Sequence, residues 1–170
     1  KVFDTGYGAD LTVVEEATEF IQRKTKNENL PQLTSCCPGW VKYVEQYYPE
    51  LLAHLSSCRS PQQMFGSVAK SILPDEMKIK REDLAVVSIM PCTAKKFEAG
   101  RPEFSGKDGR DVDYVLTTQE LAAMIKEAGI RFNDLQPESL DIPMGFKTGA
   151  GLIFGASGGV SEAVLRFAYE

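Results

Sequence analysis

The sequence predicts an α/β fold in which layers of mostly parallel β-strands are flanked by helices. Segments with strand character alternate with segments of helical character along the chain, which is the pattern of layered α/β domains. The segment 84–90, Leu-Ala-Val-Val-Ser-Ile-Met, is almost continuously apolar, as expected for a strand buried on both faces of a parallel sheet. The 170 residues are enough for one domain with a substantial core.

Helix-start signals organise the first half of the chain. Asp10 is a helix-capping residue, and Leu, Val, Thr and Ile follow it at helical spacing, at positions 11, 14, 18 and 21. Ser60, Pro61 and Gln63 form a second start signal, with a serine cap and proline at the first helical position. We expect helices from Asp10 to about Lys24, from Gly39 to about Tyr48 and from Pro61 to about Leu73, and a short strand over 30–35.

The second half alternates in the same way. Thr118 is a capping residue and Gly129 a stop signal, so a helix is expected between them. Residues 141–159 are rich in glycine and mostly uncharged. The other expected elements are a strand over 112–116 and a last helix from Gly158 to about Ala168, with surface connections over 80–83 and 99–111.

Composition and charge exclude several classes of function. A net charge of −5 and the lack of a basic stripe argue against a nucleic-acid partner. No apolar run reaches the ~18 residues that would span a membrane. Four cysteines are too few for a disulfide scaffold. The chain begins without methionine or a signal peptide and looks excised from a longer protein, so a cytoplasmic location is expected, or a periplasmic one if an upstream signal was removed.

Two cysteine-containing segments carry the chemistry of this sequence. They are Thr34-Ser-Cys-Cys-Pro-Gly-Trp40 and Met90-Pro-Cys-Thr-Ala-Lys-Lys-Phe-Glu98. Each lies where a strand is expected to end, which is where α/β folds place ligands. Neighbouring side chains in extended chain point to opposite sides, so Cys36 and Cys37 are expected to have different roles, and the Pro-Gly after them to form a tight turn. Thiolates suit zinc or iron–sulfur clusters.

Other readings of these residues are weaker. Zinc sites usually contain a Cys-x-x-Cys pair, which is absent, and the only histidine, His54, is expected at the surface. A cysteine hydrolase would need His54 as its base without any orienting group. No phosphate-binding loop is present, and the glycines over 145–159 either permit close backbone packing or form a thin wall against a bulky cofactor. A closely spaced cysteine run for an electron-relay cluster is also missing.

The two cysteine segments resemble the first two of the three signature segments of iron-only ([FeFe]) hydrogenases. The segments Ser60–Gly66, Gly151–Gly155 and Gly158-Gly159 resemble family segments too, so the likeness extends over essentially the whole chain. The resemblance implies the catalytic-domain fold of that family and an enzyme that interconverts molecular hydrogen with protons and electrons. It also implies the H-cluster, a 4Fe-4S cubane linked to a two-iron unit.

The resemblance also assigns roles to individual residues. Cys37 and Cys92 are implied to be cubane ligands, and Cys36 the proton donor and acceptor at the two-iron unit. Lys95 would hydrogen-bond a cyanide ligand, with Glu98 bracing that loop. Met90, Pro61, Gln62, Phe154 and Gly155 would line the two-iron site. The implied proton route runs from Cys36 through Glu16, Ser56, Glu19 and Arg23, although Glu16, Glu19 and Arg23 alone would indicate only a solvated helix face.

The third signature segment, with two further cysteines, is missing from these residues, and Cys58 does not match any family ligand position. We therefore expect residues 1–170 to be a partial catalytic domain that binds little iron and is inactive alone. The implied partners are the missing C-terminal part, a ferredoxin or nicotinamide-linked electron-transfer module, and the H-cluster maturation proteins. The alternatives are a hydrogenase-like protein for iron–sulfur cluster assembly or transport, and a hydrogenase-like sensory domain, neither of which turns over hydrogen.

Overall fold

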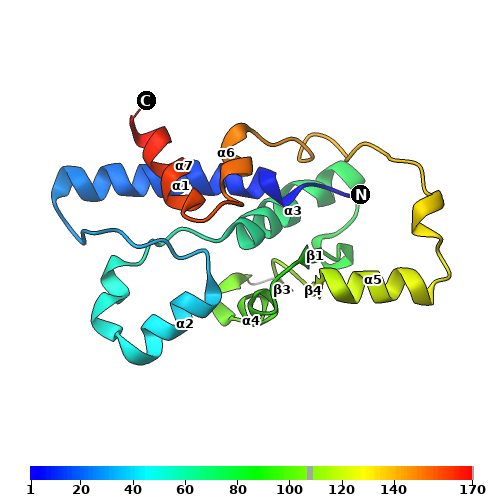
Figure 1. The fold of residues 1–170 in the computed structure, drawn as a ribbon, viewed down its shortest axis with the longest axis horizontal. Helices are drawn as coiled ribbons and strands as arrows, with labels where there is room; N and C mark the ends of the chain where they lie inside the picture. The colour runs from blue at the N-terminus through cyan, green and yellow to red at the C-terminus, as the bar shows by residue number, and fades with distance from the viewer. Residues whose placement is uncertain (107–108, 170) are drawn as a thin grey trace. The chain divides into compact units, whose positions relative to one another are not determined.

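The computed structural model describes residues 1–106 and 109–169. Figure 1 shows the order of their helices and strands. The chain forms two compact units: one contains Lys1–Phe65 together with the C-terminal residues from Asp141, and the other contains Gly66–Leu140. Helix α3 (Pro61–Met77) begins in the first unit and continues in the second.

The first unit is built on the long helix α1 (Thr5–Lys26), against which α6 (Gly149–Ile153) and α7 (Gly159–Tyr169) pack, as Figure 1 shows. Helix α2 (Pro38–Tyr47) is followed by a 3-10 helix, η1 (Pro49–His54). The strand expected over 30–35 is reduced to one parallel bridge between Leu33 and Leu55. The remainder of that segment is therefore loop.

The predicted start of the first helix is wrong by five residues. Asp4 is the N-cap, and its carboxylate accepts the backbone N–H of Gly6 at 2.8 Å. Asp10 instead accepts hydrogen bonds from the backbone N–H groups of Thr148 (2.6 Å) and Gly151 (2.9 Å). Asp10 thus fixes the start of α6, a short helix that the sequence pattern did not predict, because its five residues are too few to show a period.

The residues that the sequence places at helical spacing on one side of α1 do not form its buried face. Val14 is 42% exposed and Ile21 is 44% exposed, whereas the neighbouring stripe is buried. Small side chains on that stripe let other backbone segments approach closely, and a polar group, Glu16, is buried among them. The buried residues of α1 are Gly8, Ala9, Thr12, Val13, Glu16 and Ala17.

Two other helix starts follow their local sequence. The thiol of Cys37, the N-cap of α2, accepts the backbone N–H of Trp40 at 3.5 Å. Pro38 and Gly39 form the first helical positions rather than the tight turn that was expected. At α3 the predicted cap is confirmed, because Ser60 Oγ accepts the backbone N–H of Gln63 at 3.4 Å. Helix α3 runs on past the expected end and contains Pro74.

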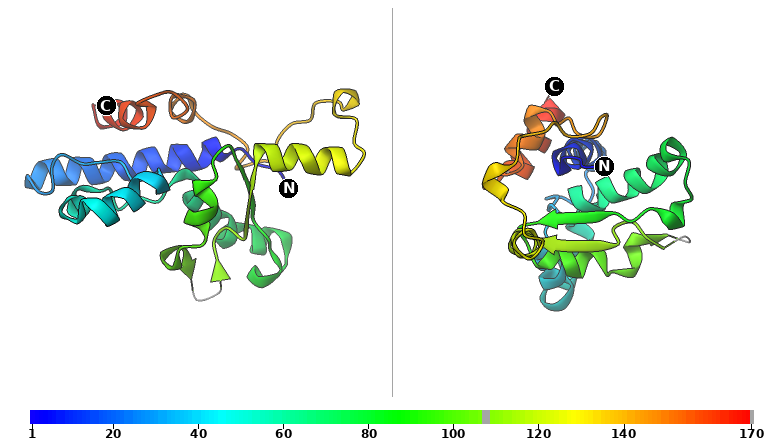
Figure 2. Two further views of the ribbon diagram at one scale, coloured as in Figure 1. Left: turned by 60° about the horizontal axis from the view of Figure 1, so that its bottom comes forward. Right: turned by 90° about the vertical axis from the view of Figure 1, so that its right-hand side faces the viewer.

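The second unit contains a parallel pair of strands, β1 (Val87–Met90) and β4 (Tyr114–Thr117), which lie side by side in Figure 2. Their register pairs Val87 with Tyr114 and Met90 with Thr117. This parallel pairing confirms the predicted α/β class. The expectation that β1 is buried on both faces is wrong for this sheet: Val87 is 51% exposed and Ile89 is 39% exposed.

Helices and short elements surround this strand pair. Thr117, one residue before the predicted cap, forms a capping box with Glu120 at the start of α5, and the helix ends before Gly129 at φ 68°. The predicted surface connections are partly buried, because Asp111 is 5% exposed and its carboxylate accepts from Arg81 at 2.9 Å. The elements are η2 (Arg81–Asp83), α4 (Ala94–Ala99), η3 (Pro102–Phe104), β2 (Ser105–Gly106), β3 (Gly109–Arg110), α5 (Thr118–Glu127) and η4 (Phe132–Asp134).

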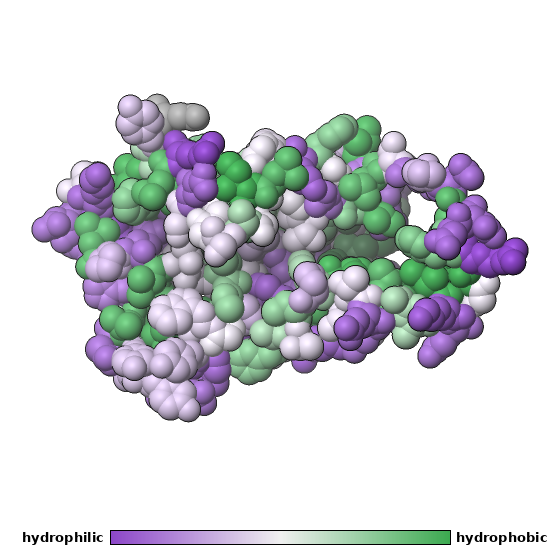
Figure 3. Space-filling view, in the orientation of Figure 1, coloured by the Kyte–Doolittle hydropathy of each residue, from purple (hydrophilic) through white to green (hydrophobic). Residues whose placement is uncertain are grey.

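Polar side chains form a large share of what is buried. Glu16, Gln63, Lys70 and Glu98 are each 5% exposed or less, while many large apolar side chains reach the surface, as the green areas of Figure 3 show. Buried polar groups are normally hydrogen-bonded. In the described part of the chain, the buried side-chain atoms without a hydrogen-bond partner are Glu16 Oε1, Gln32 Oε1 and both polar atoms of the Gln63 amide. Such atoms are candidates for contact with a ligand or a transferred proton.

No helix in the described ranges is both long and apolar enough to cross a membrane.

Candidate functional site

The double cysteine lies directly before α2. Cys37 is exposed and has an extended backbone (φ −96°, ψ 109°), while Cys36 is half-buried. Because consecutive side chains of an extended backbone point to opposite sides, the two thiols face different surroundings. This difference fits the predicted division of labour between one metal ligand and one proton carrier. No disulfide joins the four cysteines, all of which lie within the described ranges.

A network of hydrogen bonds surrounds the carboxylate of Glu19 in the first unit. Ser56 Oγ donates to Glu19 Oε2 at 2.6 Å, and Arg23 Nη2 donates to Glu19 Oε1 at 2.7 Å. The backbone N–H of Ser57 donates to both carboxylate oxygens at 3.1 Å, and its hydroxyl donates to Oε1 at 3.1 Å. Burial alone would raise the pKa of Glu19, but these hydrogen bonds together hold it below the ordinary value of 4.5. Glu19 is therefore ionised at neutral pH.

Glu16 lies one helical turn before Glu19 and has the opposite environment. It is 1% exposed, and Oε1 has no hydrogen-bond partner. Burial, with a smaller contribution from the charge of Glu19, raises the pKa of Glu16 from 4.5 to about 7. The charge of Arg23 and the nearby Ser56 hydroxyl act in the opposite direction. The Ser56 hydroxyl, which donates to Glu19 Oε2, thus lies near two carboxyl groups, one with a pKa near neutral pH and one ionised.

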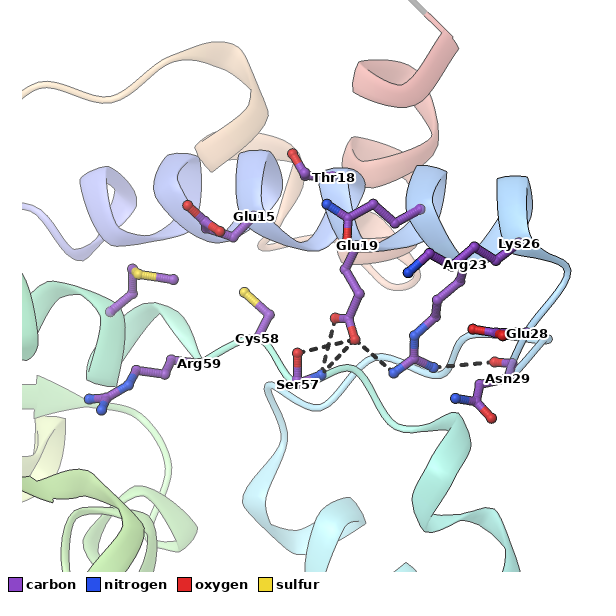
Figure 4. Close-up of a pocket in the computed structure, with 12 residues that line it drawn as sticks. Glu15, Thr18, Glu19, Arg23, Lys26, Glu28, Asn29, Ser57, Cys58 and Arg59 are labelled. Atoms are coloured by element: carbon purple, nitrogen blue, oxygen red, sulfur yellow. Dashed lines mark hydrogen bonds and ion pairs between the residues drawn. The ribbon is translucent and has the colours of Figure 1, made fainter.

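The outer end of this network opens on a polar cavity of about 570 Å³, shown in Figure 4. Glu19, Ser57, Cys58 and Arg59 line it together with residues of the second half of α1. Arg23 spans its edge, because its guanidinium also donates to the backbone carbonyl groups of four residues. These are Asn29 (3.2 Å), Ala53 (3.2 Å), His54 (3.1 Å) and Leu55 (2.7 Å).

Cys58 has the properties of a neutral thiol. Burial, followed by the charges of Glu16, Glu15 and Glu19, raises its pKa to about 12. Its sulfur donates to the carbonyl of Thr12 at 3.8 Å. Metal ligands must be thiolates, so Cys58 is unsuited to ligation, in agreement with its exclusion from the predicted ligands.

The other predicted residues of the first unit occupy two helix ends. Pro61 and Gln62 start α3, and Gln62 is 2% exposed. Phe154 is the C-cap of α6 and Gly155 follows it. Two nearby glycines have a packing reason: a Cβ on Gly151 would lie 2.9 Å from the carbonyl oxygen of Gly6, and a Cβ on Gly159 would collide with the backbone carbonyl of Ile153.

The second unit brings the second cysteine segment to the carboxyl ends of its parallel strands. Met90 ends β1 opposite Thr117 of β4, and Cys92 follows, exposed, just before α4. This edge is where parallel sheets bind ligands, and a cavity of about 680 Å³ there is lined by Pro91, Cys92, Thr93 and Thr117–Glu120, with Ala123.

Lys95 is not the solvated charge that its position in the sequence alone would indicate. Its ammonium group lies 3.0 Å and 3.1 Å from the two carboxylate oxygens of Glu98. The two side chains are only 13% and 4% exposed. The ion pair holds Lys95 in place at the start of α4.

Sequence reasoning missed two residues of this region. Ser57 makes three hydrogen bonds to Glu19, and Gln63 is fully buried with its amide unpaired. Both lie next to residues that were singled out, Ser56 and Gln62, but neither has a spacing that would mark it. Only the fold reveals them.

Within the described ranges, no group of three or more His, Cys, Asp or Glu side chains is arranged to hold a metal ion. Cys37 and Cys92 are nevertheless suitable thiolate donors, because both are exposed and each stands at the start of a helix. The donor chemistry fits an iron–sulfur cluster. Fold and site together define an α/β protein with two adjacent thiols just before a helix, a third thiol just after a β-strand, and a network of carboxyl and hydroxyl groups.

Comparison with known proteins identifies the family. Residues 1–170 match the family described as "Iron only hydrogenase large subunit, C-terminal domain". The chain is 54% identical over 171 residues to "Iron hydrogenase 1" of Clostridium pasteurianum, covering 100% of this chain and 30% of that protein. It is 54% identical over 170 residues to the "Periplasmic [Fe] hydrogenase large subunit" of Nitratidesulfovibrio vulgaris, covering 99% and 40%.

A structure of apo [FeFe]-hydrogenase from Chlamydomonas reinhardtii superimposes with a TM-score of 0.86 at 46% identity, covering 100% of this chain and 43% of that one. A more distant relative, "Cytosolic Fe-S cluster assembly factor narfl" of Xenopus tropicalis, is 38% identical over 99% of this chain and 38% of its own length. The chain thus belongs to the iron-only hydrogenase large-subunit family, and it spans 30% to 40% of the length of these curated relatives.

Proposed function

We propose that residues 1–170 form part of the catalytic domain of an [FeFe] hydrogenase that interconverts molecular hydrogen with protons and electrons. The observation that carries this proposal is the buried series of Glu16, Ser56 and Glu19, which ends at a polar cavity. A carboxyl group of pKa about 7, a hydroxyl and an ionised carboxylate in contact are the parts that a proton relay needs. An enzyme that consumes or releases protons at a buried centre needs such a relay.

Within this chain, the residues divide the work of moving protons. Glu16 can hold or release a proton near neutral pH, because its folded pKa is close to 7. A hydroxyl can both donate and accept a proton, and the Ser56 hydroxyl donates to Glu19 Oε2 at 2.6 Å and lies near Glu16. Cys36 is the inner member of the route, where its thiol would exchange a proton with the reacting centre. Arg23 holds Glu19 at the outer end.

The residues of this chain fit the H-cluster as its cofactor. Cys37 and Cys92 would bind two irons of the cubane, and the other cubane positions would need ligands from outside these 170 residues. Lys95, fixed by Glu98, would donate to a diatomic ligand of the two-iron unit. Met90, Pro61, Gln62, Phe154 and Gly155 would line that unit. The cluster, when bound, supplies the electrons and the binding place for hydrogen.

The chemistry also implies partners. A ferredoxin or nicotinamide-linked module would exchange electrons with the cluster, and maturation proteins would insert it. Because the thiolates of residues 1–170 would bind only two irons of the cubane, we propose that these residues are inactive as an isolated chain.

The second candidate is a protein that assembles or carries iron–sulfur clusters. The relative from Xenopus tropicalis, whose name describes an assembly factor, favours it. Cluster transfer needs thiolates but no proton route. The pairing of a neutral-poised Glu16 with an ionised Glu19 therefore supports the hydrogenase reading over this one.

A cysteine panel in the full-length, cofactor-loaded protein tests the proposal. We expect Cys36→Ala to retain iron and to lose hydrogen turnover, because the proton carrier is removed and the ligands stay. Cys37→Ala and Cys92→Ala should each lose iron as well as turnover. Cys58→Ala is the matched control and should retain both, since its thiol is neutral and half-buried.

Iron content by atomic absorption and hydrogen evolution by gas chromatography give the two readouts. Wild-type protein that holds iron but evolves no hydrogen, and passes its cluster to an apo-ferredoxin, would favour the assembly function. Full turnover in Cys36→Ala would contradict the proposed route.

A further inference from the structure

Glu19 Oε1, the carboxylate oxygen that faces Arg23 and Ser57, has no lone pair left to accept a proton directly from solvent. Oε1 accepts from Arg23 Nη2 (2.7 Å), the Ser57 backbone N–H (3.1 Å) and the Ser57 hydroxyl (3.1 Å). Oε2 accepts from Ser56 (2.6 Å) and the same Ser57 N–H (3.1 Å). A carboxylate oxygen offers about two lone-pair sites, so Oε1 is saturated. A proton that reaches or leaves it must pass through a group that is already bonded.

Arg23 cannot be that group. A guanidinium has five N–H donors, no acceptor, and a pKa above the range in which it deprotonates in proteins. Its donors are also engaged with four backbone carbonyls, from Asn29 to Leu55. These bonds tie the C-terminal part of α1 to Asn29 in the segment that follows it and to the C-terminal end of η1. Arg23 is therefore a clamp that positions Glu19.

The remaining outer donors are the two groups of Ser57. A backbone amide N–H does not exchange protons on the timescale of a relay, because the nitrogen has no basic lone pair. A hydroxyl donates one proton and accepts another. Ser57 is exposed and lines the cavity together with Glu19, and Figure 4 shows its side chain directly facing the Glu19 carboxylate.

We infer that the Ser57 hydroxyl, and not Arg23, transfers protons between Glu19 and the solvent of this cavity. In the inward direction, the Ser57 O–H bond breaks as its proton bonds to Glu19 Oε1, and the Ser57 oxygen takes a proton from a hydronium ion, leaving water. The outward direction reverses each bond. One proton moves in each case, no electrons are exchanged, and the serine is regenerated. The inference rests on the proposed function for the reason why protons move here, and on the contacts of Glu19 for the path that they take.

The cavity suits such an exchange. Its other charged lining residues have mixed signs, with Glu15, Glu28, Lys26 and Arg59 around Glu19 and Arg23. A lining of mixed sign neither excludes nor traps a hydronium ion as a wall of one sign would. Thr18 also lines the cavity, but its hydroxyl donates to the carbonyl of Val14 in its own helix at 2.7 Å.

An isosteric pair of variants isolates the hydroxyl. Ser57→Thr and Ser57→Val have side chains of the same shape, and only threonine can relay a proton. Both keep the backbone N–H that holds Glu19, and valine has a methyl group in place of the hydroxyl. Thr18→Val is the matched control, since it removes a cavity hydroxyl that does not touch Glu19.

The deciding measurement is the rate at which Glu19 is protonated after a light-triggered drop in pH, followed by time-resolved infrared spectroscopy. It uses the full-length protein without its cofactor, and the Glu19 band is the carboxyl band that disappears in Glu19→Gln. We expect Ser57→Val to be slower than Ser57→Thr by about tenfold or more, and Thr18→Val to match the wild type. A smaller difference between the pair would mean that solvent reaches Glu19 directly, which overturns the inference.

Hydrogen turnover of the cofactor-loaded variants provides a separate readout. If the proposed function fails, no variant evolves hydrogen, but the infrared comparison still decides the role of Ser57. If the inference fails, turnover is normal in the wild type and the infrared rates of the Thr and Val variants agree.

Discussion

Glu16 provides a direct test of the electrostatics of the relay that does not depend on catalysis. The residue is 1% exposed, and its Oε1 atom has no hydrogen-bond partner. Replacing Glu16 by glutamine keeps the shape of the side chain and removes the ionisation. The variant therefore measures how much the buried charge costs the folded protein.

The size of the effect follows from the pKa. Raising the pKa of Glu16 from 4.5 to about 7 corresponds to about 3 kcal/mol, at ~1.36 kcal/mol for each pKa unit. Because the folded state holds this proton more tightly than the unfolded state, the contribution of Glu16 to stability falls as pH rises between 4.5 and about 7. Below pH 4.5 no cost is present. Above pH 7 the full cost applies.

The assay is urea unfolding of the full-length protein at a series of pH values from about 4 to 8, where ΔG is extrapolated to water. We expect the unfolding free energy of Glu16→Gln to exceed that of the wild type by an amount that grows with pH and reaches up to about 3 kcal/mol at pH 8. Glu15→Gln, at the neighbouring exposed position, is the control and should run parallel to the wild type. A constant difference between Glu16→Gln and wild type across this range would refute the buried-charge argument.

Two further predictions concern packing and ion pairs, and thermal or urea unfolding of the full-length protein checks both. Lys70→Ala should lower the unfolding free energy by about 3 kcal/mol, because Lys70 is 5% exposed and lies 2.8 Å from Asp113. Lys80 forms an exposed ion pair with Glu82, in which the two side chains are 78% and 71% exposed. Lys80→Ala should therefore change the unfolding free energy by less than about 1 kcal/mol. Equal losses in the two variants would contradict the reasoning. Gly8→Ala should cost about 1–3 kcal/mol, since its methyl group would press on the backbone carbonyl of Pro61. Gly149→Ala, which has open space around the added methyl group, should be neutral or stabilising, and a Gly8→Ala protein as stable as this control would show that the contact relaxes freely.

Local signals in the sequence predicted the positions of several elements well. The cap at Ser60, the stop at Gly129 and the parallel pairing of the two apolar strands all appear in the structure. The cap and the stop depend on neighbouring residues that satisfy or end the helix within a few positions, and the strand pairing follows from the apolar strand pattern. Local signals failed where a distant partner changed the outcome. Asp10 resembles a helix cap but serves α6, more than 130 residues later in the chain.

The residues of the candidate site also differ in whether local sequence or a distant partner determines their surroundings. The two cysteine segments are contiguous, so the sequence alone was enough to find Cys36, Cys37 and Cys92. Glu16 and Glu19 look like one solvated helix face in sequence, whereas one is buried and the other is bonded to serines of a distant loop. Their roles in proton transfer, like the ligand roles of the cysteines, stay predictions until the variants are measured.

The sequence by itself determined the family, the α/β class and the thiol-bearing segments, because those depend on residue types and on short spacings. Only the tertiary structure decided which carboxyl group is neutral near pH 7 and which is ionised, and that Ser57 joins the network. Desolvation and hydrogen bonding set a pKa, and both depend on groups that the fold brings from elsewhere in the chain. The same residue type therefore has a pKa of about 7 at position 16 and a pKa below its ordinary value at position 19.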